Sequence, residues 1–229
     1  MKIYVGTSGY SYFWNEGKKD PLGWYVSKGF KTVEINSTFY SFPSYASIKR
    51  WSKVGEDFIF SVKVNRIITH YTKLAKVDLF KNFYTKFEPL LEKIKFWLFQ
   101  FPPSFLCTDK NFEKLESFAK DLSIKGVPVL EFRDPCWWKF KNYVIKLGYI
   151  FCSVSAPALP NDIVNNKGTI YMRFHGKDEW YSYVYSEKEL KNYYDKIINS
   201  KAEEAYLYFN NDLGMLENAL FMKRLSEKL

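Results

Sequence analysis

The sequence predicts an α/β fold of a single domain over residues 1–229, a (β/α)8 TIM-like barrel whose parallel sheet is closed. Three observations lead to this prediction. Segments with strand character alternate eight times with helical or connecting segments, which is typical of parallel sheets. Five of the strands carry apolar residues on one parity and chemically active polar residues on the other, which suits a barrel lumen. The length of 229 residues also suits one α/β barrel.

The eight expected strands are short runs rich in β-branched and aromatic residues. In chain order they are 2–8, 32–37, 58–65, 95–101, 127–133, 149–155, 169–175 and 205–210. The runs with one apolar and one polar face are TVEIN, IFSVKV, VLEFRD, IYMRFHG and YLYFNND. Their polar residues concentrate toward the carboxyl ends of the runs, where the mouth of a barrel would lie.

Helical or connecting segments separate these strands. They are expected at 21–29, 44–53, 77–94, 110–122, 137–147, 186–200 and 214–228. Two helices have recognisable starts: Thr108 or Asp109 precedes one, and Ser186 with Glu189 three residues later forms a capping box at another. The segment APALPNDIVNNKG, residues 156–168, is rich in Pro and Asn and predicts a loop over the mouth instead of a helix.

An open doubly wound sheet is the alternative architecture. Its central strands would be apolar on both faces, whereas the second face here carries Glu, Lys, Arg, His and Asn. The sequence also contains no glycine-rich phosphate loop of the GxGxxG or GxxxxGK[ST] kind. We therefore favour the barrel and expect no nucleotide cofactor.

Composition narrows the class of protein. Hydrophobic residues make up 47% and aromatic residues 20% of the chain, so a large core is expected and disorder is not. No run reaches the ~20 apolar residues of a membrane helix, and no signal peptide is expected. Three widely spaced cysteines, Cys107, Cys136 and Cys152, contain no CxxC pair and favour a reducing cytoplasm over a structural zinc site.

The net charge of +9, from 34 basic and 25 acidic residues, permits nucleic-acid binding. A surface rich in Lys and Glu explains the same charge without any such partner. No membrane partner is expected.

Seven ordered motifs resemble one known family. GTSGYSYFW, VEINSTFYSFP, FSVKVNRIITH, FQFPPSF, EFRDPCWW, YMRFHG and YFNND run from near the start of the chain to its last strand. They are similar to those of the YecE-like family, the domain of unknown function numbered 72, and the match extends over nearly the whole chain. The resemblance implies a TIM-like barrel and does not name a reaction.

The candidate catalytic residues are carboxylates and histidines at strand ends. They are Glu34, Glu131, His70 and His175. Two alternatives are purely structural: Glu34 would pair with a cation inside the barrel, or Glu131 would form an ion pair with Arg133 on its own strand. We expect Glu131 and Arg173 to serve function more than folding, so that their loss would change stability little.

The candidate binding residues lie at the same strand ends. They are Asn36, Tyr40, Lys63, Gln100, Arg133, Arg173, Asn210 and Asn211. Arg133, Arg173 and Lys63 would make the mouth positive, which suits a phosphate or carboxylate. A divalent metal stays an open alternative, with the two glutamates and two histidines as a mixed oxygen and nitrogen shell.

These residues favour a cytoplasmic enzyme that acts on a small anionic, phosphate-bearing substrate by acid/base chemistry, with hydrolysis or phosphodiester cleavage ahead of isomerisation. A nucleic-acid-binding or nuclease-type protein is the first alternative. A glycosidase-like enzyme that uses two carboxylates is the second.

Overall fold

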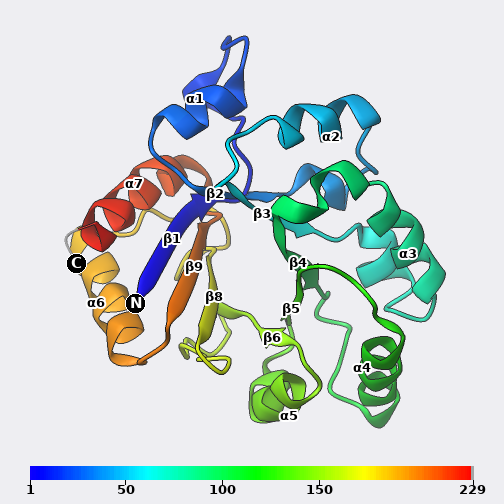
Figure 1. The fold of residues 1–229 in the computed structure, drawn as a ribbon. Coiled ribbons are helices and arrows are strands. Elements are labelled where there is room, and N and C mark those ends of the chain that lie inside the picture. The colour runs from blue at the N-terminus through cyan, green and yellow to red at the C-terminus, as the bar shows by residue number, and fades with distance from the viewer. Residues whose placement is uncertain (228–229) are drawn as a thin grey trace. The chain divides into compact units, whose positions relative to one another are not determined.

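The computed structural model describes residues 1–227 and shows an α/β fold built on two parallel sheets (Figure 1). The chain forms two compact units. Unit 1 contains Met1–Glu34 and the chain from Cys152 onward, and unit 2 contains Ile35–Phe151. The four-stranded sheet lies in unit 1, and all of the five-stranded sheet except Thr32–Glu34 of its first strand lies in unit 2.

Unit 1 contains the four-stranded sheet, in the order β1-β9-β8-β7. Its strands are β1 (Lys2–Thr7), β7 (Ser153–Ser155), β8 (Thr169–Phe174) and β9 (Glu204–Phe209), and all of their pairings are parallel. Its helices are α1 (Pro21–Ser27), α6 (Glu187–Asn199) and α7 (Met215–Ser226), with 3-10 turns at Phe13–Asn15 and Asp212–Gly214. Helix α7 packs on β1 and β9, and α6 packs on α7.

The five-stranded sheet has the order β2-β3-β4-β5-β6. Its strands are β2 (Thr32–Ile35), β3 (Ile59–Lys63), β4 (Ile94–Gln100), β5 (Val127–Glu131) and β6 (Ile150–Phe151). The helices of unit 2 are α2 (Tyr45–Ser52), α3 (Val77–Thr85), α4 (Asp109–Asp121) and α5 (Lys141–Lys146). A π-helical turn lies at Ile67–Tyr71, and 3-10 turns lie at Ser37–Phe39, Glu88–Lys93 and Pro135–Phe140.

Aromatic rings fill the core of unit 2 between α3, α4 and β4. Phe80 contacts Trp97, Phe99 and Phe118 with ring centroids between 5.1 and 5.9 Å apart. Ring pairs at such distances add to the stability that burial provides. The high aromatic content of the sequence is therefore used in packing here.

The expected strands and helices coincide with the observed ones in most places, and the α/β class with parallel sheets is confirmed. The sixth strand, expected at 149–155, is wrong as one strand, because the chain leaves β6 of one sheet at Phe151 and enters β7 of the other at Ser153. The helix expected at 77–94 ends at Thr85, and a 3-10 turn that contains Pro89 follows it. Proline cannot continue an α-helix because it lacks the backbone N–H.

Other expected elements have smaller differences. The helix expected at 137–147 begins as a 3-10 turn and becomes α5 at Lys141. Segment 156–168 contains no helix, as expected. The capping box of Ser186 and Glu189 is present at α6, with the Ser186 N–H donating to Glu189 Oε2 at 2.9 Å. Position 228, the last residue of the helix expected at 214–228, lies outside the described residues.

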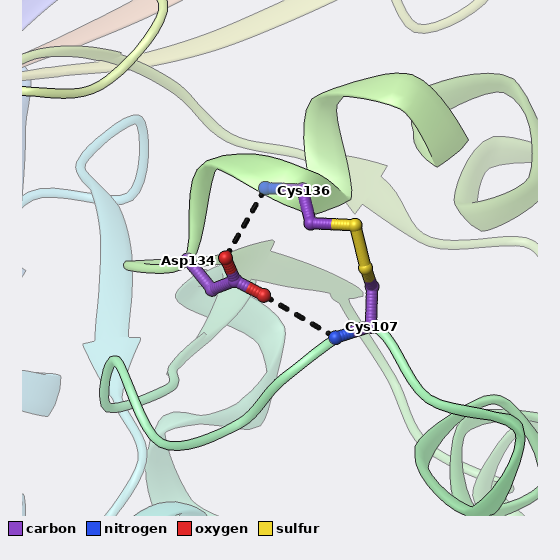
Figure 2. A group of neighbouring side chains, drawn as sticks. All are labelled: Cys107, Asp134 and Cys136. Atoms are coloured by element: carbon purple, nitrogen blue, oxygen red, sulfur yellow. Dashed lines mark hydrogen bonds between the residues drawn. A yellow bond between two sulfur atoms is a disulfide. The ribbon is translucent and has the colours of Figure 1, made fainter.

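The structure contains a disulfide that the spacing of the cysteines did not predict. Cys107 and Cys136 form a disulfide (Figure 2), and their Cα atoms are 6.0 Å apart. Cys152 is buried and takes no part in it. The two partners are 29 residues apart in the sequence, so their spacing gave no local signal. They come together because the segments after β4 and after β5 follow neighbouring parallel strands.

None of the helices within residues 1–227 is both long enough and apolar enough to cross a membrane.

Candidate functional site

Polar side chains of unit 1 gather on β2 and β8 and directly after the ends of β1, β8 and β9. We call this set the Glu34 cluster, and it contains Ser8, Glu34, Tyr171, Arg173, His175 and Asn210. The sheet register aligns Arg173 on β8 with Tyr208 on β9. His175 and Asn210 follow these two positions by two residues each, so their side chains point to the same face.

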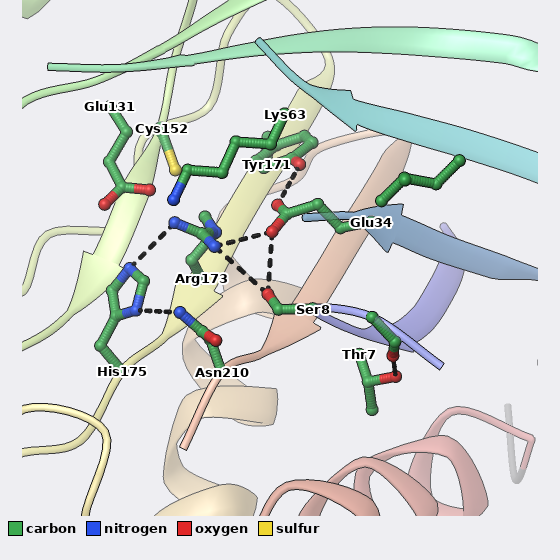
Figure 3. Close-up of polar contacts among 12 residues, drawn as sticks. Thr7, Ser8, Glu34, Lys63, Glu131, Cys152, Tyr171, Arg173, His175 and Asn210 are labelled. Carbon is green, nitrogen blue, oxygen red and sulfur yellow. Dashed lines mark hydrogen bonds and ion pairs between the residues drawn. The ribbon is translucent and has the colours of Figure 1, made fainter. Parts of the chain in front are cut away.

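Glu34 accepts hydrogen bonds through both of its carboxylate oxygens (Figure 3). Its Oε1 accepts hydrogen bonds from Arg173 Nη2 at 2.7 Å and from Ser8 Oγ at 2.8 Å, and its Oε2 accepts one from the Tyr171 hydroxyl at 2.7 Å. The side chains of Glu34 and Arg173 are both 0% exposed. Both oxygens of this carboxylate are engaged by donors, which suits it to hold Arg173 in place more than to transfer protons.

Tyr171 is held in the protonated form that this arrangement needs. Burial, and after it the charge of Glu34, raise the pKa of Tyr171 well above its ordinary value. The hydroxyl therefore donates to Glu34 at any physiological pH.

His175 is buried and contacts neighbours through both ring nitrogens. Its Nε2 lies 3.4 Å from Arg173 Nη1, and its Nδ1 lies 3.1 Å from the Asn210 amide nitrogen. A guanidinium can only donate, so the Arg173 contact needs a lone pair on Nε2. The ring lies between Arg173 and Asn210 (Figure 3).

Asn211 lies next to Asn210 in the sequence but is directed elsewhere. Its Nδ2 donates to the Tyr183 carbonyl at 2.7 Å and to Asn218 Oδ1 at 2.8 Å. Asn218 belongs to α7, so Asn211 ties the end of β9 to that helix. Its role in binding a substrate stays a prediction.

Unit 2 contains a second set of polar residues, which we call the His70 cluster. It contains His70 and the four cations Lys63, Arg66, Lys73 and Arg133. His70 lies in the π-helical turn after β3, and such turns are frequent at functional sites. The Phe39 ring lies 4.2 Å from Lys63 Nζ, and its centroid lies 5.0 Å from that of the imidazole.

The four cations act on the imidazole from three segments of unit 2. Burial contributes most to lowering the pKa of His70 to about 4, and the charges of Lys63, Arg133, Lys73 and Arg66 contribute in that order. His70 is therefore neutral at physiological pH. Its Nδ1 lies 2.9 Å from Thr69 Oγ1, so a tautomer with the proton on Nδ1 leaves the lone pair on Nε2.

This lowered pKa predicts a pH dependence of stability. Between the ordinary pKa of 6.5 and about 4, the unfolded chain binds more protons than the folded chain at His70. We expect the free energy of unfolding to decrease as the pH falls through this window and to be insensitive to His70 above it. An NMR titration of the His70 ring and thermal midpoints from pH 8 to 4 will check this. The decrease should be smaller in His70→Gln, and a His70 that titrates near 6.5 would contradict the prediction.

Glu131 and Arg133 form the ion pair that was the structural alternative for this strand. Arg133 Nη2 lies 2.6 Å from Glu131 Oε1, and both side chains are buried. Gln100 is aligned with Glu131 across β4 and β5, and its Nε2 donates to the Phe101 carbonyl at 3.0 Å. Glu131 and Gln100 therefore share one face of the sheet at its carboxyl edge.

Asn36 and Tyr40 lie on either side of the 3-10 turn after β2. The Oδ1 atom of Asn36 is buried and has no hydrogen-bond partner among the described residues. Tyr40 is 67% exposed, and its ring lies 5.8 Å from the Arg66 guanidinium. Arg66 also lies 6.0 Å from the ring of Tyr71, which is exposed as well.

Sequence reasoning missed several members of these sets. Ser8 and Tyr171 share the inward parity of their strands, so the same alternation could have identified them. Arg66 and Lys73 lie in loops, where no periodicity applies. Among the described residues, Cys107, Asp134 and Cys136 form a group of three potential metal ligands, whose ligand atoms lie within 4.8 Å of one another. This group differs from the glutamate and histidine shell expected from the sequence.

Three comparisons relate the chain to known proteins. The model of the family described as "Protein of unknown function DUF72" matches residues 4–229. The UPF0759 protein YunF of Bacillus subtilis (strain 168) is 25% identical over 93% of this chain and 89% of its own length. A crystal structure of a DUF72 family protein from Thermotoga maritima MSB8 is 31% identical, with a TM-score of 0.88 over 99% of this chain and 100% of that one. A DUF72 family protein from Enterococcus faecalis V583, 22% identical over 98% of this chain and 95% of its own, has the same fold with a TM-score of 0.85.

Proposed function

We propose a function for this chain, which belongs to the DUF72 family of proteins of unknown function, from the charges around His70. The chain is an enzyme that binds a small anionic, phosphate-bearing substrate at the His70 cluster and uses acid/base chemistry on it. Hydrolysis or phosphodiester cleavage ranks ahead of isomerisation. The observation that carries this proposal is a half-buried imidazole whose pKa is lowered by burial and by the charges of four cations.

The electrostatics support an anion as the ligand. Lys63 and Arg133 are largely buried, and Arg133 already pairs with Glu131. The charges of Lys63, Lys73 and Arg66 add to a positive environment around His70, and such an environment attracts an anion. An anion would also cancel the repulsion that lowers the pKa of His70. The imidazole would then gain basicity when substrate binds, which suits a general base.

The two glutamates have different roles in this proposal. Glu131 is the last residue of β5, two residues before Arg133, and is the carboxylate that would exchange a proton with substrate or with His70. Glu34 is engaged by three donors and positions Arg173. That saturation disfavours a glycosidase-like reaction, because such a reaction needs two carboxyl groups free to act on the sugar.

We further propose that the chain folds as a closed TIM-like barrel, the architecture expected from the sequence. The Ser8–Glu34 parallel bridge, which links the end of β1 to β2, supports this arrangement. A crystal structure of the phosphate-soaked protein tests this arrangement directly. The cytoplasmic compartment expected from the sequence is part of the same proposal.

Phosphate binding tests the anion site. At low salt, added inorganic phosphate is expected to raise the pKa of His70 from about 4 toward 6.5, as followed by NMR of the ring. In Lys63→Met, the same rise in the pKa of His70 should need at least about tenfold more phosphate, because the substitution removes a buried charge next to the site. Lys110→Met, which removes an exposed charge on α4, is the matched control and should behave as the parent.

The acid/base part of the proposal has its own readout. Hydrolysis of an aryl phosphodiester should decrease about 10²-fold or more in His70→Asn while phosphate still binds. A His70 pKa that phosphate does not move would exclude the anion site. Unchanged hydrolysis in His70→Asn would exclude this histidine as the base.

The nucleic-acid alternative rests on a different observation. Tyr40 and Tyr71 are exposed, and the Arg66 guanidinium lies over both rings. Exposed aromatic rings beside cations stack on nucleobases. Affinity for single-stranded nucleic acid that falls steeply with salt, and that is lost in Tyr40→Ala, would favour this alternative over a small-molecule enzyme.

A further inference from the structure

The disulfide in unit 2 lies within a set of metal-binding groups. Asp134 Oδ1 accepts a hydrogen bond from the Cys136 N–H at 3.2 Å, and Asp134 Oδ2 accepts one from the Cys107 N–H at 3.3 Å (Figure 2). Both sulfurs and a carboxylate oxygen lie within 4.8 Å of one another. The carboxylate is thus fixed to the backbone of both cysteines, and all three side chains are partly exposed.

The two segments that carry the cysteines are held together by packing as well as by the disulfide. Trp137, directly after Cys136, stacks on Phe105 and on Phe132 with centroids 5.6 and 4.4 Å apart. The indole Nε1 also donates to the Phe105 carbonyl at 2.7 Å. These contacts do not involve sulfur, so they will keep Cys107 and Cys136 close when the disulfide is reduced.

We propose that reduction of the Cys107–Cys136 disulfide creates a zinc site whose ligands are the two cysteines and Asp134. Two thiolates and a carboxylate are ligands that Zn²⁺ accepts, with Zn–S distances of about 2.3 Å. Tetrahedral geometry then places the sulfurs about 3.8 Å apart. The two sulfurs therefore need to move only a short way from their positions in the disulfide. Three protein ligands leave the fourth position to water, the arrangement of zinc sites that perform chemistry.

The two states of this site exclude each other. A thiol reductant reduces the S–S bond to two protein thiols and is itself oxidised to a disulfide. Zinc binding then displaces the protons of both thiols. The other oxygen of Asp134 can keep a backbone N–H bond, which orients the carboxylate toward the ion. The proposal is independent of the function proposed for the His70 cluster.

Metal titration of the full-length protein tests this site. Chain reduced with a phosphine and freed of metal should bind about one Zn²⁺. With Co²⁺ as the probe, it should show a sulfur-to-metal charge-transfer band and the strong visible absorption of a tetrahedral ion. The oxidised chain should show neither. Asp134→Asn should weaken Zn²⁺ binding more than about tenfold. Cys152→Ser, which removes the third cysteine, is the matched control and should bind as the parent.

Alkylation of the unmodified chain gives a second readout that does not depend on how a variant folds. Zn²⁺ should protect Cys107 and Cys136 of the reduced chain from alkylation, as mapped by mass spectrometry. A reduced chain that binds no metal would overturn the proposal. So would binding that Asp134→Asn leaves intact, or binding that Cys152→Ser abolishes.

Discussion

Arg173→Met is expected to lower the free energy of unfolding by about 3–5 kcal/mol, because it leaves the Glu34 carboxylate buried without its cation. Both side chains are 0% exposed and their charged atoms are 2.7 Å apart. Chemical denaturation of parent and variant measures the difference. This result would revise the sequence-based expectation that Arg173 serves function more than folding.

Two further variants show whether the stranded charge is the cause. The double variant Glu34→Gln, Arg173→Met removes both charges and should recover part of the loss. Lys177→Met removes one partner of the exposed Lys177–Glu189 pair and should cost no more than about 1 kcal/mol. If Arg173→Met were as stable as the parent, the pair would not hold the fold together, and the functional interpretation of Arg173 would stand.

Removing the disulfide has the second large expected effect. The Cys107→Ser, Cys136→Ser variant should lose about 3–4 kcal/mol of stability, because the bond closes a loop between residues 29 apart and restricts the unfolded chain. Denaturation of the oxidised parent and the variant, both with a chelator present, measures this loss without any contribution from zinc. Equal midpoints would mean that the packing around Trp137 already supplies the restriction.

Much of the fold and part of the site follow from patterns that the sequence displays directly. A period of two identifies the polar face of a strand, and this is why Glu34, Arg173, His175 and Asn210 were recognised together. The same period could have identified Ser8 and Tyr171. The resemblance in seven ordered motifs identified the family, which the family model confirms.

Other features depend on contacts that no local pattern encodes. The three donors to Glu34 come from β1 and β8, far along the chain, so its saturation follows only from the fold. Cys107 pairs with Cys136 because the strands that precede them, β4 and β5, are neighbours in the sheet. The break between Phe151 and Ser153 has no glycine or proline to mark it, because Cys152 alone separates β6 from β7.

The division of the chain into units also constrains how it is made. Unit 2 is one continuous stretch, Ile35–Phe151, whereas unit 1 needs both the first 34 residues and the chain from Cys152 onward. During synthesis on the ribosome, unit 2 can therefore complete its contacts before β9, the neighbour of β1 in the sheet, has been made. Strand β1 emerges first and finds its partner last. Until β9 is made, the unpaired edge of β1 can pair with a wrong strand. Binding of a nascent-chain chaperone to β1 would prevent this pairing.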